Sequence, residues 1–145
     1  MQGRLVPAQY FRDPADYDRY LENSNFLADV NNERADKNKA YAKNLAGLVR
    51  FVMYMFGEDT TMIPKETAWF EEVNGTVNTP LRGRKMYSED WLGLKELDRN
   101  GGLKFIQIPG DHMQIGVDTL NKSMTEYFGP INKKFSNEES YSWEL

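Results

Sequence analysis

The chain of 145 residues contains no cysteine and a single histidine, His112. Without cysteine, a thiol nucleophile, a disulfide framework and cysteine-ligated zinc are excluded. With one histidine, a metal site would have to consist of carboxylates alone, and no D-x-D-x-D-G loop is present. Glycine-rich loops that bind phosphate are absent as well. We therefore expect neither a metal nor any other cofactor.

The sequence also lacks long apolar runs and clusters of one charge. No run approaches the roughly 20 residues of a membrane-spanning helix, and the first ten residues lack the apolar core of a signal peptide. The net charge is −4, with acidic and basic residues interspersed. We expect no integral membrane segment, and neither nucleic acid nor an anionic membrane as a partner.

Two apolar runs predict β-strands. The run "FVMYMF" (51–56) has no alternation, which is typical of a strand covered on both faces. A continuation of the preceding helix is the alternative, disfavoured because Gly57 and Asp59 end the run so soon. The run "LKFIQI" (103–108) predicts a second strand. A helical segment between the two favours a parallel pair with a right-handed crossover.

Three segments show helical periodicity, beginning near Asn38, Ser88 and Val117. Asn38 and Ser88 are expected to cap the first two helices, and Gly101-Gly102 and Gly129-Pro130 to end the last two. The apolar positions at helical spacing are Tyr41, Leu45, Leu48 and Val49, then Trp91, Leu94 and Leu97, then Val117, Leu120, Met124 and Phe128.

The remaining segments are polar. Residues 1–35 look irregular, with a short apolar anchor at Phe26-Leu27, and residues 64–85 look like an exposed excursion that turns at Asn74-Gly75. N-glycosylation acceptor triplets begin at Asn74 and Asn121, but such triplets often occur by chance. Two strands cannot cover their own faces, so the fold class predicted is α/β, as the C-terminal part of a larger sheet.

The candidate chemistry lies at the carboxyl ends of the two predicted strands. Glu58 and Asp59 follow the first strand, and Asp111 and His112 follow the second. A carboxylate that accepts the Nδ1 proton of His112 would leave Nε2 free to take a proton from a nucleophile, as in a catalytic triad. Asp111 is too close in sequence to reach the ring easily, and Glu58 lies nearer the strand, so Asp59 is the favoured acid.

The chain order also fits α/β-hydrolases, in which the nucleophile comes first, then the acid, then a histidine on a late loop. No G-x-S-x-G elbow occurs in the sequence, so no nucleophile is visible. The alternative is that His112 is a structural or exposed turn residue, and that Asp59 is an ordinary turn residue or helix cap.

Three segments of the sequence are similar to a known family; they are "LVPAQYFRDPADYDRYLENSNFLADVNNER", "KNLAGLVRFVMYMFGEDTTMIPKETAWF" and "YSEDWLGLKELDRNGGLKFIQIPGDHMQI". In order and spacing they resemble the C-terminal half of the palmitoyl-protein thioesterases, which are lysosomal α/β-hydrolases, and the resemblance covers about residues 5–128.

The resemblance implies a role for particular positions. Asp59 matches the family's triad acid and His112 its base. Residues 1–35 match the end of an inserted lid that encloses the acyl chain, which would bring Phe26 and Leu27 near the substrate; the alternative is that both are plain core anchors. Residues 36–129 would form the C-terminal portion of the hydrolase core, and residues 130–145 a polar and mobile tail.

The implied activity is removal of long-chain fatty acyl groups from cysteine thioesters by Ser-His-Asp chemistry. The expected partners are S-acylated proteins or peptides and acyl thioesters, and the implied location is lysosomal or secreted. The serine and the oxyanion-hole donors of the family lie upstream of these residues, so we expect a missing N-terminal half. The alternative is a non-catalytic remnant that binds through self-association or a partner chain.

Overall fold

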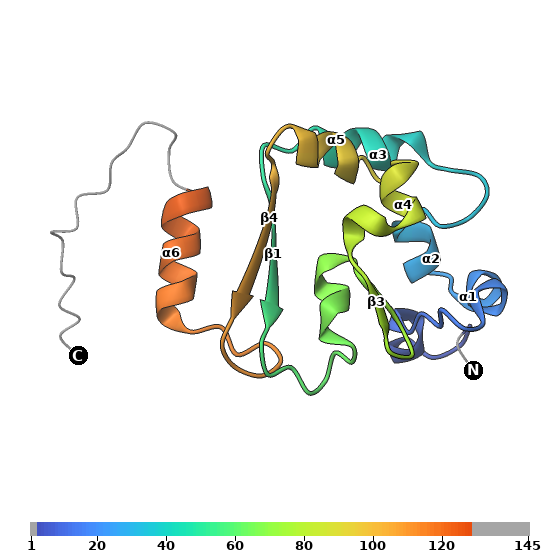
Figure 1. Ribbon diagram of the computed structural model, residues 1–145, viewed down its shortest axis with the longest axis horizontal. Helices are drawn as coiled ribbons and strands as arrows, with labels where there is room; N and C mark the ends of the chain where they lie inside the picture. The colour runs from blue at the N-terminus through green and yellow to red at the C-terminus, as the bar shows by residue number, and fades with distance from the viewer. Residues whose placement is uncertain (1–2, 129–145) are drawn as a thin grey trace, which may run out of the picture. The chain divides into compact units, whose positions relative to one another are not determined.

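The computed structural model describes residues 3–128 and divides after Met113 into two compact units (Figure 1). The second unit contributes one described helix, α6 (Val117–Tyr127). The elements of the first unit are the 3-10 helix η1 (Pro7–Tyr10), α1 (Tyr17–Asn23), α2 (Leu27–Val30), α3 (Lys39–Ala46), β1 (Phe51–Phe56), the 3-10 helix η2 (Lys65–Trp69), β2 (Glu72–Asn74), β3 (Val77–Thr79), the 3-10 helix η3 (Leu81–Gly83), α4 (Lys85–Ser88), α5 (Leu94–Arg99) and β4 (Leu103–Ile108).

The two long strands are the two predicted from their apolar runs. Strands β1 and β4 pair in parallel, in a register from Phe51 opposite Leu103 to Phe56 opposite Ile108, and Figure 1 shows them side by side. Helix α3 directly precedes β1 in the chain and helix α5 directly precedes β4, and the two helices pack against each other. The first unit therefore has parallel strands with flanking helices, as expected of the α/β class.

The apolar core lies on one face of the strand pair. Its buried members are Met53, Leu81, Met86, Leu92, Leu94, Leu97 and Leu103. The indole of Trp69, in η2, donates a hydrogen bond to the carbonyl of Met53 at 3.0 Å and packs edge-on against Phe105. The prediction that both faces of β1 are covered is correct only in part, because Val52 and Tyr54 on its second face are half-buried.

Helix α3 begins where the sequence predicts but ends earlier. The side chain of Asn38 accepts a hydrogen bond from the amide of Ala40 at 3.0 Å, which confirms the cap. The helix stops at Ala46, so Leu48 and Val49 lie outside it and are 43% and 79% exposed. The predicted apolar face is therefore wrong beyond the last helical turn.

The segment 88–102 is not one helix, because its backbone turns left-handed at two positions before α5 begins. The φ angles are 55° at Asp90 and 77° at Gly93. A Cβ at Gly93 would lie 2.2 Å from the carbonyl oxygen of Ala42, so only glycine allows α3 to pass this closely. The break between α4 and α5 therefore depends on Gly93, which helical periodicity does not identify.

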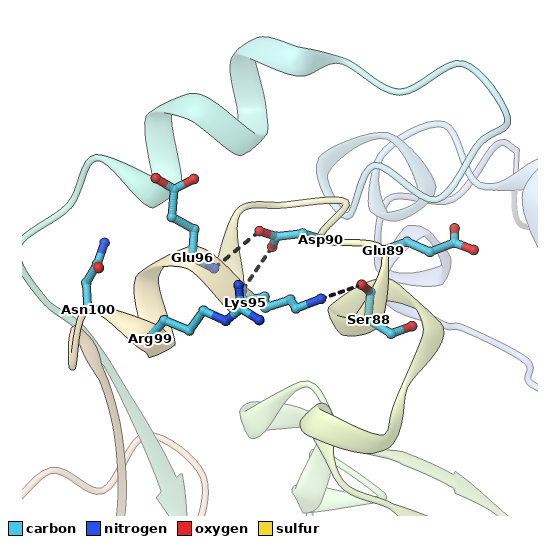
Figure 2. Close-up of a pocket in the computed structure, with 7 residues that line it drawn as sticks. All are labelled: Ser88, Glu89, Asp90, Lys95, Glu96, Arg99 and Asn100. Atoms are coloured by element: carbon cyan, nitrogen blue, oxygen red, sulfur yellow. Dashed lines mark hydrogen bonds between the residues drawn. The ribbon is translucent and has the colours of Figure 1, made fainter.

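The predicted cap at Ser88 is wrong, since Ser88 is the last residue of α4. The carboxylate of Asp90 instead accepts hydrogen bonds from the amides of Lys95 at 2.9 Å and Glu96 at 3.2 Å, in the first turn of α5. Figure 2 shows these bonds in an open hollow of about 430 Å³, where the ammonium of Lys95 also donates to the carbonyl of Ser88. The bonds of Asp90 in this hollow cap the first turn of α5.

The polar segments are more ordered than their sequence indicates. Residues 7–30 contain η1, α1 and α2, and the excursion 64–85 contains an antiparallel hairpin of β2 and β3 as well as the buried Leu81. Helix α6 confirms the predicted last helix, whereas the stop at Gly129-Pro130 and the tail 130–145 lie outside the described residues. Within residues 3–128, no helix has the length and apolarity needed to cross a membrane.

Candidate active site

Asp59 and His112 meet beyond the carboxyl ends of β1 and β4. Because the two strands are parallel neighbours, the loops that follow them leave the sheet at the same edge. The loops stay paired past the strands, where the amide of Gly57 donates to Ile108 at 2.8 Å and that of Glu58 to Gly110 at 3.1 Å. The Nδ1 atom of His112 lies 2.9 Å from Oδ2 of Asp59.

The carboxylate of Asp59 is held on both of its oxygens. Its side chain is 5% exposed, and Oδ1 accepts the backbone amides of Thr61 at 2.9 Å and Met62 at 2.7 Å. Desolvation alone would raise the pKa of Asp59. The hydrogen bonds from His112 and from the two amides outweigh it and hold that pKa below its ordinary value. Asp59 is therefore an ionised acceptor over a wide pH range.

The imidazole of His112 is anchored on one side and open on the other. An ionised carboxylate can only accept, so Nδ1 donates the proton and Nε2 is left as a bare acceptor. Among residues 3–128 no hydrogen-bond partner of Nε2 is present, and the side chain is 34% exposed. The ring centroid lies 6.3 Å from that of the buried Phe56. The arrangement can accept a proton at Nε2 from an approaching group.

The two other acids considered for this role lie nearby but do not bind the ring. The side chain of Glu58 is exposed, with no hydrogen bond to any other residue in the described range 3–128. Asp111 instead accepts bonds from Thr60 and from the backbone of His112. Sequence reasoning found no role for Asp111 or Thr60; their only signal was their position beside the candidate pair.

The remaining predicted residues lie apart from this pair in the sequence. Phe26 is 45% exposed and stacks at 5.3 Å from the ring of Tyr10, while Leu27 is half-buried at the start of α2. Asn74 is exposed where β2 ends, and Asn121 lies on α6. No group of three or more histidine or acidic residues in the described part of the chain could hold a metal ion.

A second carboxylate cluster lies in the N-terminal segment and was not foreseen. The side chain of Glu33 is 1% exposed and accepts hydrogen bonds from Nε of Arg12 at 2.9 Å, from Tyr17 at 2.9 Å and from Tyr20 at 3.0 Å. Burial and the charge of Glu33 raise the pKa of Tyr17 to about 12, so its hydroxyl remains a donor. Arg12 also pairs with Glu72 on β2, which ties the first 35 residues to the hairpin.

These features define an α/β protein in which an aspartate–histidine pair occupies the carboxyl edge of parallel strands. Residues 1–112 match the model of the family described as palmitoyl protein thioesterase, and the match ends on His112. The chain belongs to this family. The resemblance inferred from the sequence is thereby confirmed.

Curated relatives agree with the family match. The chain is 38% identical over 132 residues to palmitoyl-protein thioesterase 1 of Caenorhabditis elegans, covering 88% of the chain and 44% of that protein. It is 45% identical over 125 residues to palmitoyl-protein thioesterase 3 of Dictyostelium discoideum, covering 84% and 43%. It is 33% identical over 105 residues to lysosomal thioesterase PPT2-B of Xenopus laevis, covering 70% and 36%. The chain therefore spans less than half the length of these relatives.

Proposed function

We propose that this chain supplies the acid and the base of a hydrolase that removes long-chain fatty acyl groups from cysteine thioesters. The observation that carries the proposal is the 2.9 Å bond between Nδ1 of His112 and Asp59, at adjacent strand ends, in a chain of this family. S-acylated proteins or peptides are the proposed substrates. The names of the relatives, palmitoyl-protein thioesterases, support that class.

The proposed chemistry follows from the tautomer of His112. Asp59 fixes the proton on Nδ1, so Nε2 accepts the proton of a serine hydroxyl as the serine attacks the thioester carbonyl. The thiol leaves, and protonated His112 returns the proton to the leaving sulfur. In the second half of the cycle Nε2 activates water against the acyl-enzyme. Asp59 stabilises the imidazolium that forms in both steps.

The serine and the oxyanion-hole donors are proposed to come from polypeptide other than these 145 residues, since no G-x-S-x-G elbow occurs among them. A longer chain or a separate partner could carry them. Residues 1–35 are proposed as the end of a lid, with Phe26 and Leu27 near the acyl chain, and residues 36–129 as part of a hydrolase core. The partly exposed Phe26 ring is compatible with a contact of this kind.

A lysosomal or secreted location is part of the proposal. The name lysosomal thioesterase, which the relative from Xenopus laevis carries, supports this location. The lowered pKa of Asp59 is compatible with an acidic compartment, because the carboxylate that orients His112 stays ionised when the pH falls moderately below neutral.

The test is thioester hydrolysis by the native protein isolated from its source, with its intact mass measured on the same sample. His112→Ala should lower kcat for a palmitoyl thioester by at least about 10³-fold, because it removes the proposed general base. Glu58→Gln, a charge-removing change one residue from Asp59, is the control and should retain activity. Retained hydrolysis in His112→Ala would refute the assignment.

The second candidate is a non-catalytic binding protein, which the absence of a serine elbow from the sequence favours. It predicts a native mass close to the 16.9 kDa of this chain and no partner that supplies a nucleophilic serine. It also predicts no thioester hydrolysis by the wild type or by His112→Ala. The same experiment therefore separates the two functions.

A further inference from the structure

A second carboxylate joins the loops that carry Asp59 and His112. It belongs to Asp111, directly before His112, and it binds Thr60, directly after Asp59. Oδ1 of Asp111 accepts the amide of Thr60 at 2.7 Å, and the Thr60 hydroxyl lies 2.9 and 3.0 Å from the two oxygens. Oδ1 also accepts the backbone amide of His112 at 2.7 Å. One aspartate thus links the backbone of the base to the residue that follows the acid.

The two aspartates act reciprocally across the loops. Asp59, on the loop after β1, binds the ring of His112 on the loop after β4, while Asp111 on that second loop binds Thr60 on the first. The two cross-loop bonds are one residue apart, a spacing of about 3.8 Å between successive Cα atoms. A change in the separation of the loops at Thr60 therefore changes the distance from Asp59 to His112 almost directly.

We propose that Asp111 is a positioning residue for the hydrolysis proposed above: it fixes the separation of the two loops and so keeps the ring of His112 within hydrogen-bond reach of Asp59. The inference rests on the proposed function, since without catalysis there is nothing to position. Asp111 makes no contact with the ring nitrogens and is not assigned a chemical step.

The geometry indicates why such a tie is needed. His112 lies between two left-handed positions, Gly110 with φ 101° and Met113 with φ 61°, in a loop that lacks the regular bonds of a strand or helix. The bond between Nδ1 and Asp59 is 2.9 Å long, and a lengthening of well under 1 Å takes it beyond hydrogen-bond range. A displacement of about 1 Å at a reacting group can cost roughly 10²-fold in rate.

The test is the kinetics of Asp111→Ala and Asp111→Asn in the native protein. Asp111→Ala removes every acceptor and should lower kcat about 10- to 100-fold with KM within about twofold, because substrate contacts are unchanged. Asp111→Asn keeps an acceptor oxygen for the two backbone amides and should recover activity to within about threefold of the wild type. A general loss of fold would not give this recovery together with an unchanged KM.

A spectroscopic measurement reads the position of the ring without activity. The ring ¹⁵N shifts of His112, the only histidine of these 145 residues, should show a proton fixed on Nδ1 in the wild type and a mixture of tautomers in Asp111→Ala. If Asp111→Ala fails to fold, Thr60→Ala serves instead. It loses the hydroxyl and keeps the amide, and it should lower kcat about 3- to 10-fold.

The control is Asp13→Ala, because Asp13 also accepts a loop amide, that of Ala15 at 3.0 Å, outside the paired loops. It should leave kcat and the ring shifts unchanged. Unchanged kcat and unchanged shifts in Asp111→Ala, or in Thr60→Ala where that variant is used, would overturn the positioning role. Activity retained in His112→Ala would instead refute the proposed function. Altered ring shifts in Asp111→Ala would even then show that Asp111 holds the two loops together.

Discussion

The carboxylates of Glu33 and Asp59 are both almost inaccessible to solvent, yet their surroundings differ in kind. Glu33 receives an arginine and two tyrosine hydroxyls, and Asn31 donates a further bond at 3.2 Å. Arg12 also pairs with Glu72, so the donors of this cluster are bound to carboxylates within the protein. Asp59 receives two backbone amides and one imidazole, and the side chain that carries this imidazole is 34% exposed.

The difference separates a structural carboxylate from one suited to chemistry. Burial and the charge of Glu33 raise the pKa of Tyr17 and of Tyr20, so both hydroxyls stay donors to the carboxylate of Glu33. The Asp59 cluster ends in an imidazole whose Nε2 has no hydrogen-bond partner among residues 3–128. Burial of a carboxylate therefore says little about function; what matters is whether the chain of hydrogen bonds ends in an accessible titratable group.

The largest effect should come from Asp59→Asn, which would remove the orientation of His112 that the proposed function requires. The amide can donate to Nδ1 and so stabilise the wrong tautomer, and kcat for a palmitoyl thioester should fall by about 10⁴-fold. The thermal midpoint should change little, because the side-chain oxygen of asparagine can still accept the backbone amides of Thr61 and Met62. Kinetics and thermal melts on the same preparations check both statements.

Glu58→Gln is the matched control for that change, since it also replaces a carboxylate with an amide in the same loop. It should leave kcat within about twofold. Equal losses in the two variants would indicate that the negative charge of the loop matters, rather than the bond to His112, and would remove the distinction drawn between the clusters.

Glu33→Gln should show the opposite pattern, with stability lost first. The change leaves the guanidinium of Arg12 short of its most buried partner, although Glu72 still pairs with it. Removing one member of a buried ion pair typically costs 3–5 kcal/mol. Because Glu72 remains as a partner of Arg12, we expect a loss of about 3 kcal/mol in the free energy of unfolding. Urea denaturation measures the loss.

Glu22→Gln controls for the charge change, because Glu22 is exposed on α1 and should shift the free energy of unfolding by less than about 0.5 kcal/mol. If Glu33→Gln were as stable as the wild type but inactive, the cluster would have to be reassigned from structure to function.

The sequence was sufficient to predict the features that depend on local pattern. The apolar runs located β1 and β4, and their parallel order placed Asp59 and His112 at one edge, where the structure has them hydrogen-bonded. Their catalytic role stays a prediction. The choice of Asp59 over Glu58 as the partner of His112 followed from its greater distance from the strand, which is a geometric argument available in a single sequence.

Features that depend on contacts distant in sequence were not predictable in this way. The bond from Arg12 to Glu72 joins residues 60 positions apart, and nothing in the polar sequence 1–35 marks Arg12 as its origin. Gly93 looks like any other helix-interrupting glycine until the backbone of α3 is placed against it. Periodicity reports which residues share a face, but it cannot report which two elements will touch.

The pair of Arg82 and Asp98 is an intermediate case and offers the smallest predicted effect. Two bonds of 2.7 and 2.9 Å join Asp98 to a guanidinium that is 63% exposed, and Tyr87 donates to the same carboxylate at 2.7 Å. The Arg82 hydrogen bonds, opposed by burial and assisted by Tyr87, lower the pKa of Asp98. Solvent screening of the exposed arginine limits the contribution of the pair to about 1 kcal/mol.

The sign of the pH dependence follows from that lowered pKa. A carboxylate whose pKa is lower in the folded state adds stability that is fully present above its unfolded pKa and is lost as the pH falls through the folded value. Asp98→Asn should therefore be less stable than the wild type near pH 7, and the gap should close as the pH falls below the ordinary range of aspartate. Thermal melts between pH 7 and pH 3 would show this convergence. A gap independent of pH would contradict this prediction, because it would mean that the contribution of Asp98 to stability does not depend on the ionisation of its carboxylate.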